Sequence, residues 1–324
     1  MTDCPLVALI RKECILKETG QVIDLEDHQT RILNAMFTPR EDGLLKYMTY
    51  VYSTPKKEGK TAIGACVAYA FARLYGGDCI SIANDKEQAR SRMFVRVLET
   101  LAEIKKKRPV QYKRILHEDC WEHGFRGGKN ESEIVFNQTG QKNPGPHIIR
   151  AIPGDYAGEA GAMNAMTVWD ELWGYSSTSA ERLYNELQPI PAIPYSIRFI
   201  TTYAGYYGES TLLWNIYDAV VKPDAQTDEP MGQRVEGLED LPVYEEPLSK
   251  TICYWDHENR MPWKTEEFLQ AAKNAPDLRG REGECLRLWE NRWSSGAEPF
   301  LPAELIDSIM DRAEALGLRN NMAA

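Results

Sequence analysis

The chain has 324 residues, of which 43% are hydrophobic and 27% are charged, and its formal net charge is −10. These proportions exclude a mainly disordered, collagen-like or coiled-coil chain, and the acidic balance gives no support for a nucleic-acid partner, although a local basic strip remains compatible with one. The length exceeds what a single core usually supports, which predicts one large α/β domain with a smaller attachment, or two domains.

Strands and helices alternate along the first two thirds of the chain. A mixed helical region covers residues 1–45. After it, β-branched and aromatic runs predict strands at 46–53, 79–84, 132–137, 147–152, 165–171 and 195–205. Apolar periodicity predicts helices at 61–75, 85–107, 179–187 and 211–221. Such alternation is typical of an α/β fold with a central, mostly parallel sheet and helices on both faces.

The composition changes after Lys222. Residues 223–249 are rich in proline and acidic residues, which predicts a solvated excursion, and 250–255 is a candidate strand. A helical pattern follows over 264–293, and a further helix is expected within 302–316. We therefore divide the chain into a core, 1–220, and a small C-terminal lid or linker subdomain, 221–324.

Membrane and disulfide signals are weak. The longest apolar stretch, residues 61–72, is shorter than the about 20 residues that a membrane-spanning helix needs. The N-terminus lacks the pattern of a signal peptide. The seven cysteines include no CxxC pair, which favours reduced thiols of a cytosolic protein over a disulfide framework or a zinc site.

The segment PKKEGKT, residues 55–61, lies between a predicted strand and a predicted helix. Such a loop directs backbone N–H groups and a helix N-terminus at an anion, which suits phosphates. Lys60 would reach the β- and γ-phosphates, and the Thr61 hydroxyl would bind magnesium. Position 54 is Thr where the pattern GxxxxGK[ST] has glycine, and a chance GKT is the alternative.

The segment MTVWDE, residues 166–171, places two carboxylates at the end of a predicted strand. Ligands bind at the carboxyl ends of strands in open α/β sheets. Asp170 would hold magnesium through water, and Glu171 would activate the attacking water as a general base. The alternative is a solvated acidic pair at a strand end.

The segment FITTYAG, residues 199–205, also ends a predicted strand. Thr201 or Thr202 would sense the γ-phosphate there, and Gly205 would allow the chain to turn. Without context, an ordinary β-branched strand closed by a glycine is the better interpretation.

In this order and with these spacings, the three motifs resemble the ATPase motor of the terminase large subunit of tailed bacteriophages. Similar family segments are VIDLEDHQTRIL at 22–33, SIANDKEQARSRMF at 81–94 and GECLRLWENRWSSGAEPFLP at 283–302. The resemblance covers roughly residues 20–305. It implies a P-loop ATPase that uses ATP and Mg²⁺ to translocate double-stranded DNA into a procapsid, in the host cytoplasm.

The resemblance also implies roles for single residues. Gln29 would contact adenine, and the loop that binds the phosphates would comprise Pro55, Lys56, Lys57, Glu58, Gly59, Lys60 and Thr61. The family commonly has arginine at the position of Lys56, which implies a contact to the γ-phosphate within the same chain. Lysine keeps the charge but loses the planar fork. Arg150 is the best match for the arginine that a neighbouring subunit supplies in the family. Thr202 would couple the γ-phosphate state to movement of the next segment.

The implied partners are double-stranded DNA, a portal protein and a small terminase subunit. A homo-oligomeric ring is implied when the motor is assembled, with a monomer as the alternative for the isolated chain. The family's nuclease domain would begin about where these residues end. Residues 300–324 contain no cluster of carboxylates that would bind two metals, so we expect no nuclease activity from these 324 residues.

Two alternative functions remain open. The first is another P-loop DNA translocase or helicase, which is disfavoured because no helicase motif set follows residue 205. The second is a non-hydrolysing nucleotide-binding assembly protein with a decayed site. Lys60, Asp170 and Glu171 are all present, which argues against decay.

Overall fold

The computed structural model describes residues 2–83, 92–118, 133–137, 142–154, 163–225, 228–278 and 280–295. Within them, the main sheet has nine strands in the order β3-β4-β2-β5-β6-β1-β10-β9-β8. The six strands from β4 to β10 pair in parallel, and β3, β9 and β8 pair antiparallel to their neighbours. The predicted class, a mostly parallel sheet flanked by helices, is therefore confirmed.

The strands agree closely with the predicted ones. They are β1 (Thr49–Ser53), β2 (Asp78–Ala83), β3 (Glu133–Val135), β4 (Ile148–Pro153), β5 (Asn164–Asp170), β6 (Ile197–Thr202) and β10 (Thr251–Trp255). Two short strands, β7 (Tyr206–Tyr207) and β11 (Ser294–Ser295), form a separate parallel pair. The central strands β5, β6 and β10 are buried along their whole length, as expected for parallel strands covered on both faces.

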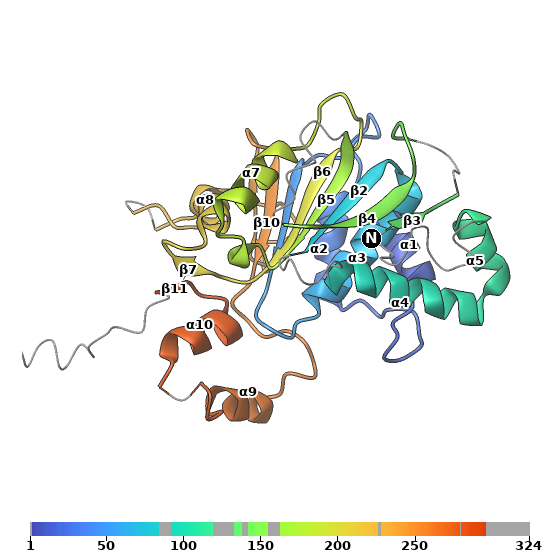
Figure 1. The fold of residues 1–324 in the computed structure, drawn as a ribbon. Coiled ribbons are helices and arrows are strands. Elements are labelled where there is room, and N and C mark those ends of the chain that lie inside the picture. The colour runs from blue at the N-terminus through green and yellow to red at the C-terminus, as the bar shows by residue number, and fades with distance from the viewer. Residues whose placement is uncertain are drawn as a thin grey trace, which may run out of the picture.

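The helices cover the two faces of the sheet (Figure 1). One core contains residues of α1 (Pro5–Glu13), α2 (Asp27–Phe37), α3 (Lys60–Leu74), α4 (Arg92–Lys107) and α5 (Pro109–Ile115). The other core contains residues of α7 (Thr178–Glu186), α8 (Thr211–Val220) and the 3₁₀ turn η2 (Leu172–Gly174). The predicted helix over 85–107 is confirmed from Arg92 onward, because residues 84–91 lie outside the described part of the chain. Helix α5 was not predicted, although Pro109 at its first turn is a usual start signal.

The expected solvated excursion at 223–249 contains two strands, β8 (Gln233–Arg234) and β9 (Val243–Glu246). Both continue the main sheet beyond β10, and β10 itself pairs with β1. The sheet thus extends to Trp255, and the division of the chain at residue 220 stays a prediction. The single helical run expected at 264–293 is two helices, α9 (Glu266–Lys273) and α10 (Glu282–Glu290), which lie outside the sheet in Figure 1. Their role as a lid stays a prediction, and the helix expected at 302–316 lies outside the described residues.

Two further expectations concern membranes and thiols. Among the described residues, no helix combines the length and the apolar character that crossing a bilayer requires. The cysteines in that part of the chain are free, and most of them are buried.

Candidate nucleotide-binding site

The loop between β1 and α3 forms a tight turn at the carboxyl edge of the sheet. Gly59 stands at the helix N-cap with φ +80°, in the left-handed region that favours glycine. Lys57 also has a positive φ, of 72°. Helix α3 begins at Lys60 directly after the turn, so its free N–H groups and the positive end of its dipole point toward the loop. This arrangement is suited to a phosphate.

Asp170, at the end of β5, lies beside the start of α3. The Thr61 Oγ1 atom is 3.5 Å from Asp170 Oδ1 and 3.4 Å from Oδ2. On the neighbouring strand β6, Thr201 donates a hydrogen bond of 2.7 Å to Asp170 Oδ1. Helix α3 lies close to β6 here, because a Cβ on Gly64 would be 3.0 Å from Thr201 Cγ2. The glycine therefore helps to bring Thr61 to the acidic strand end.

Glu171 lies opposite Lys60. Its Oε1 is 3.4 Å from Lys60 Nζ, and its Oε2 accepts a hydrogen bond of 2.9 Å from the Trp173 indole. Glu171 has φ +59°, an uncommon conformation for a residue with a side chain, and its N–H donates to the Thr201 carbonyl at 2.7 Å. Such strained residues concentrate at functional sites. The backbone thus turns this carboxylate away from β5 and toward the lysine.

Burial raises the pKa of both carboxyls. The pKa of Asp170 is raised by desolvation, against the lowering effects of the Thr201 hydrogen bond and the Lys60 charge. The pKa of Glu171 is also raised by desolvation, which outweighs the attraction of Lys60. A carboxylate with a raised pKa is a stronger base than an exposed one, which suits general-base catalysis.

The oxygen atoms of Thr61 and Asp170 fit a magnesium ion. Mg²⁺ prefers hard oxygen ligands and is usually held by one or two protein groups together with substrate phosphates and water. Among the described residues, no group of three or more His, Cys, Asp or Glu side chains is arranged to hold a metal ion.

The structure distinguishes the two threonines of β6. The Thr201 hydroxyl faces Asp170, whereas the Thr202 hydroxyl donates to the Tyr203 carbonyl at 3.0 Å. Thr202 instead contacts the loop through its backbone, because its carbonyl accepts from Thr54 N at 3.2 Å. Thr201 is therefore the threonine at the acidic centre, and the coupling role assigned to Thr202 stays a prediction.

The remaining loop residues are held by the segment that follows β10. Lys56 N donates to the Leu288 carbonyl of α10 at 2.7 Å, and Lys264 Nζ donates to the Lys56 carbonyl at 2.8 Å. Glu58 is buried and forms an ion pair of 3.0 Å with Lys264. Pro55 is buried, and the exposed Lys57 accepts a hydrogen bond from Trp263 through its carbonyl. A γ-phosphate contact by the Lys56 side chain stays a prediction.

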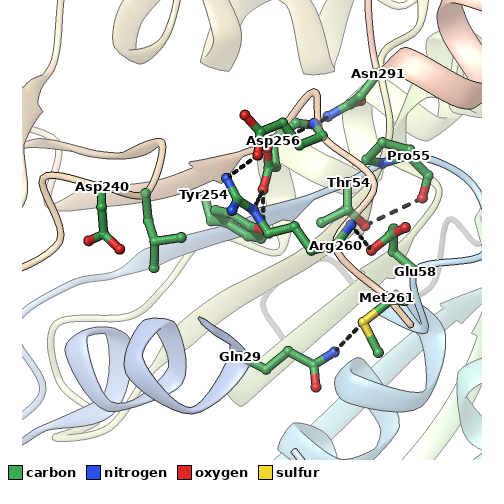
Figure 2. A network of polar contacts seen from close by, with 12 residues as sticks. Gln29, Thr54, Pro55, Glu58, Asp240, Tyr254, Asp256, Arg260, Met261 and Asn291 are labelled. Atoms are coloured by element: carbon green, nitrogen blue, oxygen red, sulfur yellow. Dashed lines mark hydrogen bonds and ion pairs between the residues drawn. The ribbon is translucent and has the colours of Figure 1, made fainter. Parts of the chain in front are cut away.

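Gln29 reaches the same region from α2 (Figure 2). Its Oε1 accepts from Glu26 N at 3.1 Å, and its Nε2 is 3.6 Å from Met261 Sδ. The residue next to Met261, Arg260, donates its backbone N–H to Glu58 Oε2 at 3.2 Å. Gln29 is thus connected to the loop through residues 260–261, and its contact with adenine stays a prediction.

Arg150 is not brought to this centre. It lies on β4 at the level of Ile80, and its guanidinium forms hydrogen bonds of 2.8–3.0 Å with Asp78, the first residue of β2. That residue is at the amino end of the parallel strands, opposite the edge with the loop. A catalytic role for Arg150 in a neighbouring subunit stays a prediction, and it requires the ion pair with Asp78 to open.

Asn291 is a site residue that sequence reasoning missed. It ends α10 in the left-handed conformation and is fully buried. Its Oδ1 accepts from Ala204 N at 2.6 Å, and its Nδ2 donates to Ser53 Oγ at 3.0 Å and to the Asp256 carbonyl at 2.8 Å. It thereby joins the ends of β1, β6 and β10. Asparagine tolerates this backbone conformation at a helix end, and that local signal was available in the sequence.

We expect Asn291→Ala to destabilise the fold by about 2–4 kcal/mol, because buried N–H and C=O groups lose their partners. Thermal unfolding followed by circular dichroism measures the effect as a clear fall in Tm. Asn274→Ala is the matched control, since Asn274 at the end of α9 makes one exposed hydrogen bond to Gln270. Equal Tm values for the two variants would refute the joining role.

No family model matches the sequence, and no curated protein matches it. Among solved structures, the HK97 bacteriophage large terminase is similar in fold, with a TM-score of 0.58 and 14% identity over 89% of this chain and 55% of that chain. The chain therefore spans about half the length of that terminase. The ATPase domain of the Thermus phage P74-26 large terminase gives TM-scores of 0.47 for a mutant and 0.45 for a second structure. The mutant is 15% identical over 84% of this chain and 100% of that chain. The second structure is 14% identical over 83% of this chain and 99% of that chain.

Proposed function

We propose that this chain is the ATP-hydrolysing motor of a viral DNA-packaging terminase. The observation that supports this most strongly is the meeting of two motifs that are far apart in sequence. Thr61 lies within 3.5 Å of Asp170, and Lys60 lies 3.4 Å from Glu171, at the edge where ligands bind in such sheets. The fold likeness to the HK97 large terminase supports the same proposal.

The proposed chemistry assigns one task to each side chain. The loop N–H groups and Lys60 bind the phosphates of ATP, and Thr61 and Asp170 hold the magnesium ion. When bound, the ion neutralises charge on the phosphate oxygens. Glu171 accepts a proton from the attacking water as the new P–O bond forms and the bond to ADP breaks.

Binding of ATP would change the ion pair between Lys60 and Glu171. Lys60 is buried, and its ammonium also lies 4.5 Å from the centre of the Tyr203 ring. A triphosphate carries more negative charge than one carboxylate and therefore competes for Lys60. Binding of ATP would thus free Glu171 Oε1 to face the attacking water.

The partners follow from the resemblance rather than from the site. We propose that the motor acts on double-stranded DNA, docks on a portal protein, receives DNA from a small terminase subunit and works as a ring in the host cytoplasm. With a net charge of −10, contact with DNA must depend on a local patch rather than on overall charge. A non-hydrolysing assembly protein is less well supported, because it has no use for a base held in a strained backbone beside Lys60.

The function is tested by measuring phosphate release from ATP with Mg²⁺, with and without double-stranded DNA. We expect weak Mg²⁺-dependent hydrolysis. Its turnover per protein molecule should increase with protein concentration, because a neighbouring subunit completes the site. DNA should stimulate it further. Failure to bind ATP at millimolar concentration in the presence of Mg²⁺ would refute the proposal.

Thr61→Ala tests the magnesium contact. Removing the hydroxyl should increase the Mg²⁺ concentration needed for half-maximal hydrolysis by about tenfold or more, because a metal ligand is lost. A magnesium titration of phosphate release measures it. Thr211→Ala is the control, since Thr211 begins α8 and its hydroxyl contacts Glu181 on the surface. The same magnesium requirement in both variants would remove Thr61 from the metal site.

A further inference from the structure

Arg287 of α10 has an unusual environment. Its side chain is 5% exposed, and Nη2 donates to Glu284 Oε2 at 3.0 Å. Its Nε and Nη1 are buried and have no hydrogen-bond partner within the described residues. A buried donor without a partner costs free energy, so such a group is expected to serve a ligand or a second conformation.

Aromatic rings surround the guanidinium. Its Cζ is 4.4 Å from the ring centres of Trp173 and Tyr206, and 5.0 Å from that of Tyr203. Cation–π contacts of this kind favour the charged form in a site with little water. The positive charge is therefore held in place, while its Nε and Nη1 have no hydrogen-bond partner among the described residues.

The rings that hold Arg287 also contact the proposed catalytic centre. Lys60 Nζ lies against the Tyr203 ring, and the Trp173 indole donates to Glu171. Arg287 is thus separated from Lys60 by one ring and from Glu171 by another. The next residue, Leu288, accepts the hydrogen bond from Lys56 N of the phosphate loop. Helix α10 is therefore attached to the loop at the residue beside this arginine.

We propose that Arg287 binds the terminal phosphate of ATP from within the same chain, so that the site distinguishes a triphosphate from a diphosphate. This inference rests on the proposed function. The free Nε and Nη1 donors would contact γ-phosphate oxygens, and Tyr203 and Trp173 would hold the guanidinium near Lys60 and Glu171. Arginine suits this task because its planar donor fork matches phosphate geometry.

The test compares the affinities of the 324-residue chain for a non-hydrolysable ATP analogue and for ADP, each with Mg²⁺, by titration calorimetry. Arg287→Gln should weaken binding of the analogue by about 10- to 100-fold, the effect of one hydrogen bond to a charged group. ADP affinity should change by less than about threefold, because ADP lacks the contacted phosphate. The control is Arg292→Gln, since Arg292 is exposed and pairs with Glu290; neither affinity should change.

Arg287→Lys keeps the charge and provides a second variant if the first does not fold. It should reduce affinity for the analogue less than Arg287→Gln does, again with little effect on ADP. Equal losses of affinity for both nucleotides would show a purely structural role for Arg287. They would overturn this inference but not the proposed function. No change for either nucleotide would overturn the inference as well. If the unaltered chain binds neither nucleotide, the proposed function itself fails.

Discussion

Lys60→Ala should reduce ATP hydrolysis to background, a loss of at least about 10²–10³-fold. The lysine supplies the buried positive charge at the start of α3, where the β- and γ-phosphates would lie. Its removal also leaves Glu171 without its ion-pair partner, so negative charge at the site increases. Phosphate release and calorimetric titration with ATP should both show the loss.

The control for this variant is Lys222→Ala. Lys222 lies on the surface after α8 and pairs with Asp218, so its removal should leave turnover unchanged. Turnover of Lys60→Ala equal to that of the unaltered chain would contradict the phosphate-binding assignment of the whole loop.

Glu171→Gln should preserve nucleotide binding but reduce hydrolysis by about 10²–10⁴-fold. Glutamine has nearly the same shape and can still accept the Trp173 hydrogen bond, but it cannot take a proton from water. A single-turnover experiment with bound ATP separates the chemical step from binding and from product release.

Glu266→Gln is the matched control, because Glu266 lies exposed in the first turn of α9, where it accepts a hydrogen bond from Gln270. It should hydrolyse ATP at the normal rate. Normal turnover in Glu171→Gln would assign the base to another residue, whereas loss of nucleotide binding would indicate a structural role for the carboxylate.

The two main motifs were predictable because each depends on local signals and one rule of topology. A strand, a glycine turn and a helix can be recognised around Gly59, and an acidic pair ends the buried strand at Asp170. Strands β5 and β1 run in the same direction with β6 between them, so their carboxyl ends share one edge. The sequence was therefore sufficient to predict that Lys60 and Glu171 lie at the same edge of the sheet.

The choice between Thr201 and Thr202 was not predictable in the same way. Every residue of β6 is buried, so the strand has no alternation of polar and apolar positions that would show which threonine faces α3. The facing side is set by pairing with β5, where Asp170 stands opposite Thr201. Similarly, β8 is the edge strand and β9 lies next to it, and the proline and acidic residues of this segment conceal the strand signal.

Local patterns could not show that residues at α10 belong to the site, although Asn291 carried a helix-end signal. Arg287 and Asn291 follow the phosphate loop by more than two hundred positions, and only the folded chain places them beside Tyr203, Ser53 and Ala204. For Arg150, the resemblance implies a role in the site of a neighbouring subunit. Within this chain its guanidinium pairs with Asp78, and the role in the neighbouring subunit stays a prediction.

The most direct test of the account is a structure of the chain with Mg²⁺ and a non-hydrolysable ATP analogue. We expect the phosphates in the loop ending at Gly59, with Lys60 at the β- and γ-phosphates, the ion between Thr61 and Asp170, and Glu171 released from Lys60. A nucleotide bound elsewhere, or Lys60 still paired with Glu171 beside a bound triphosphate, would contradict the account.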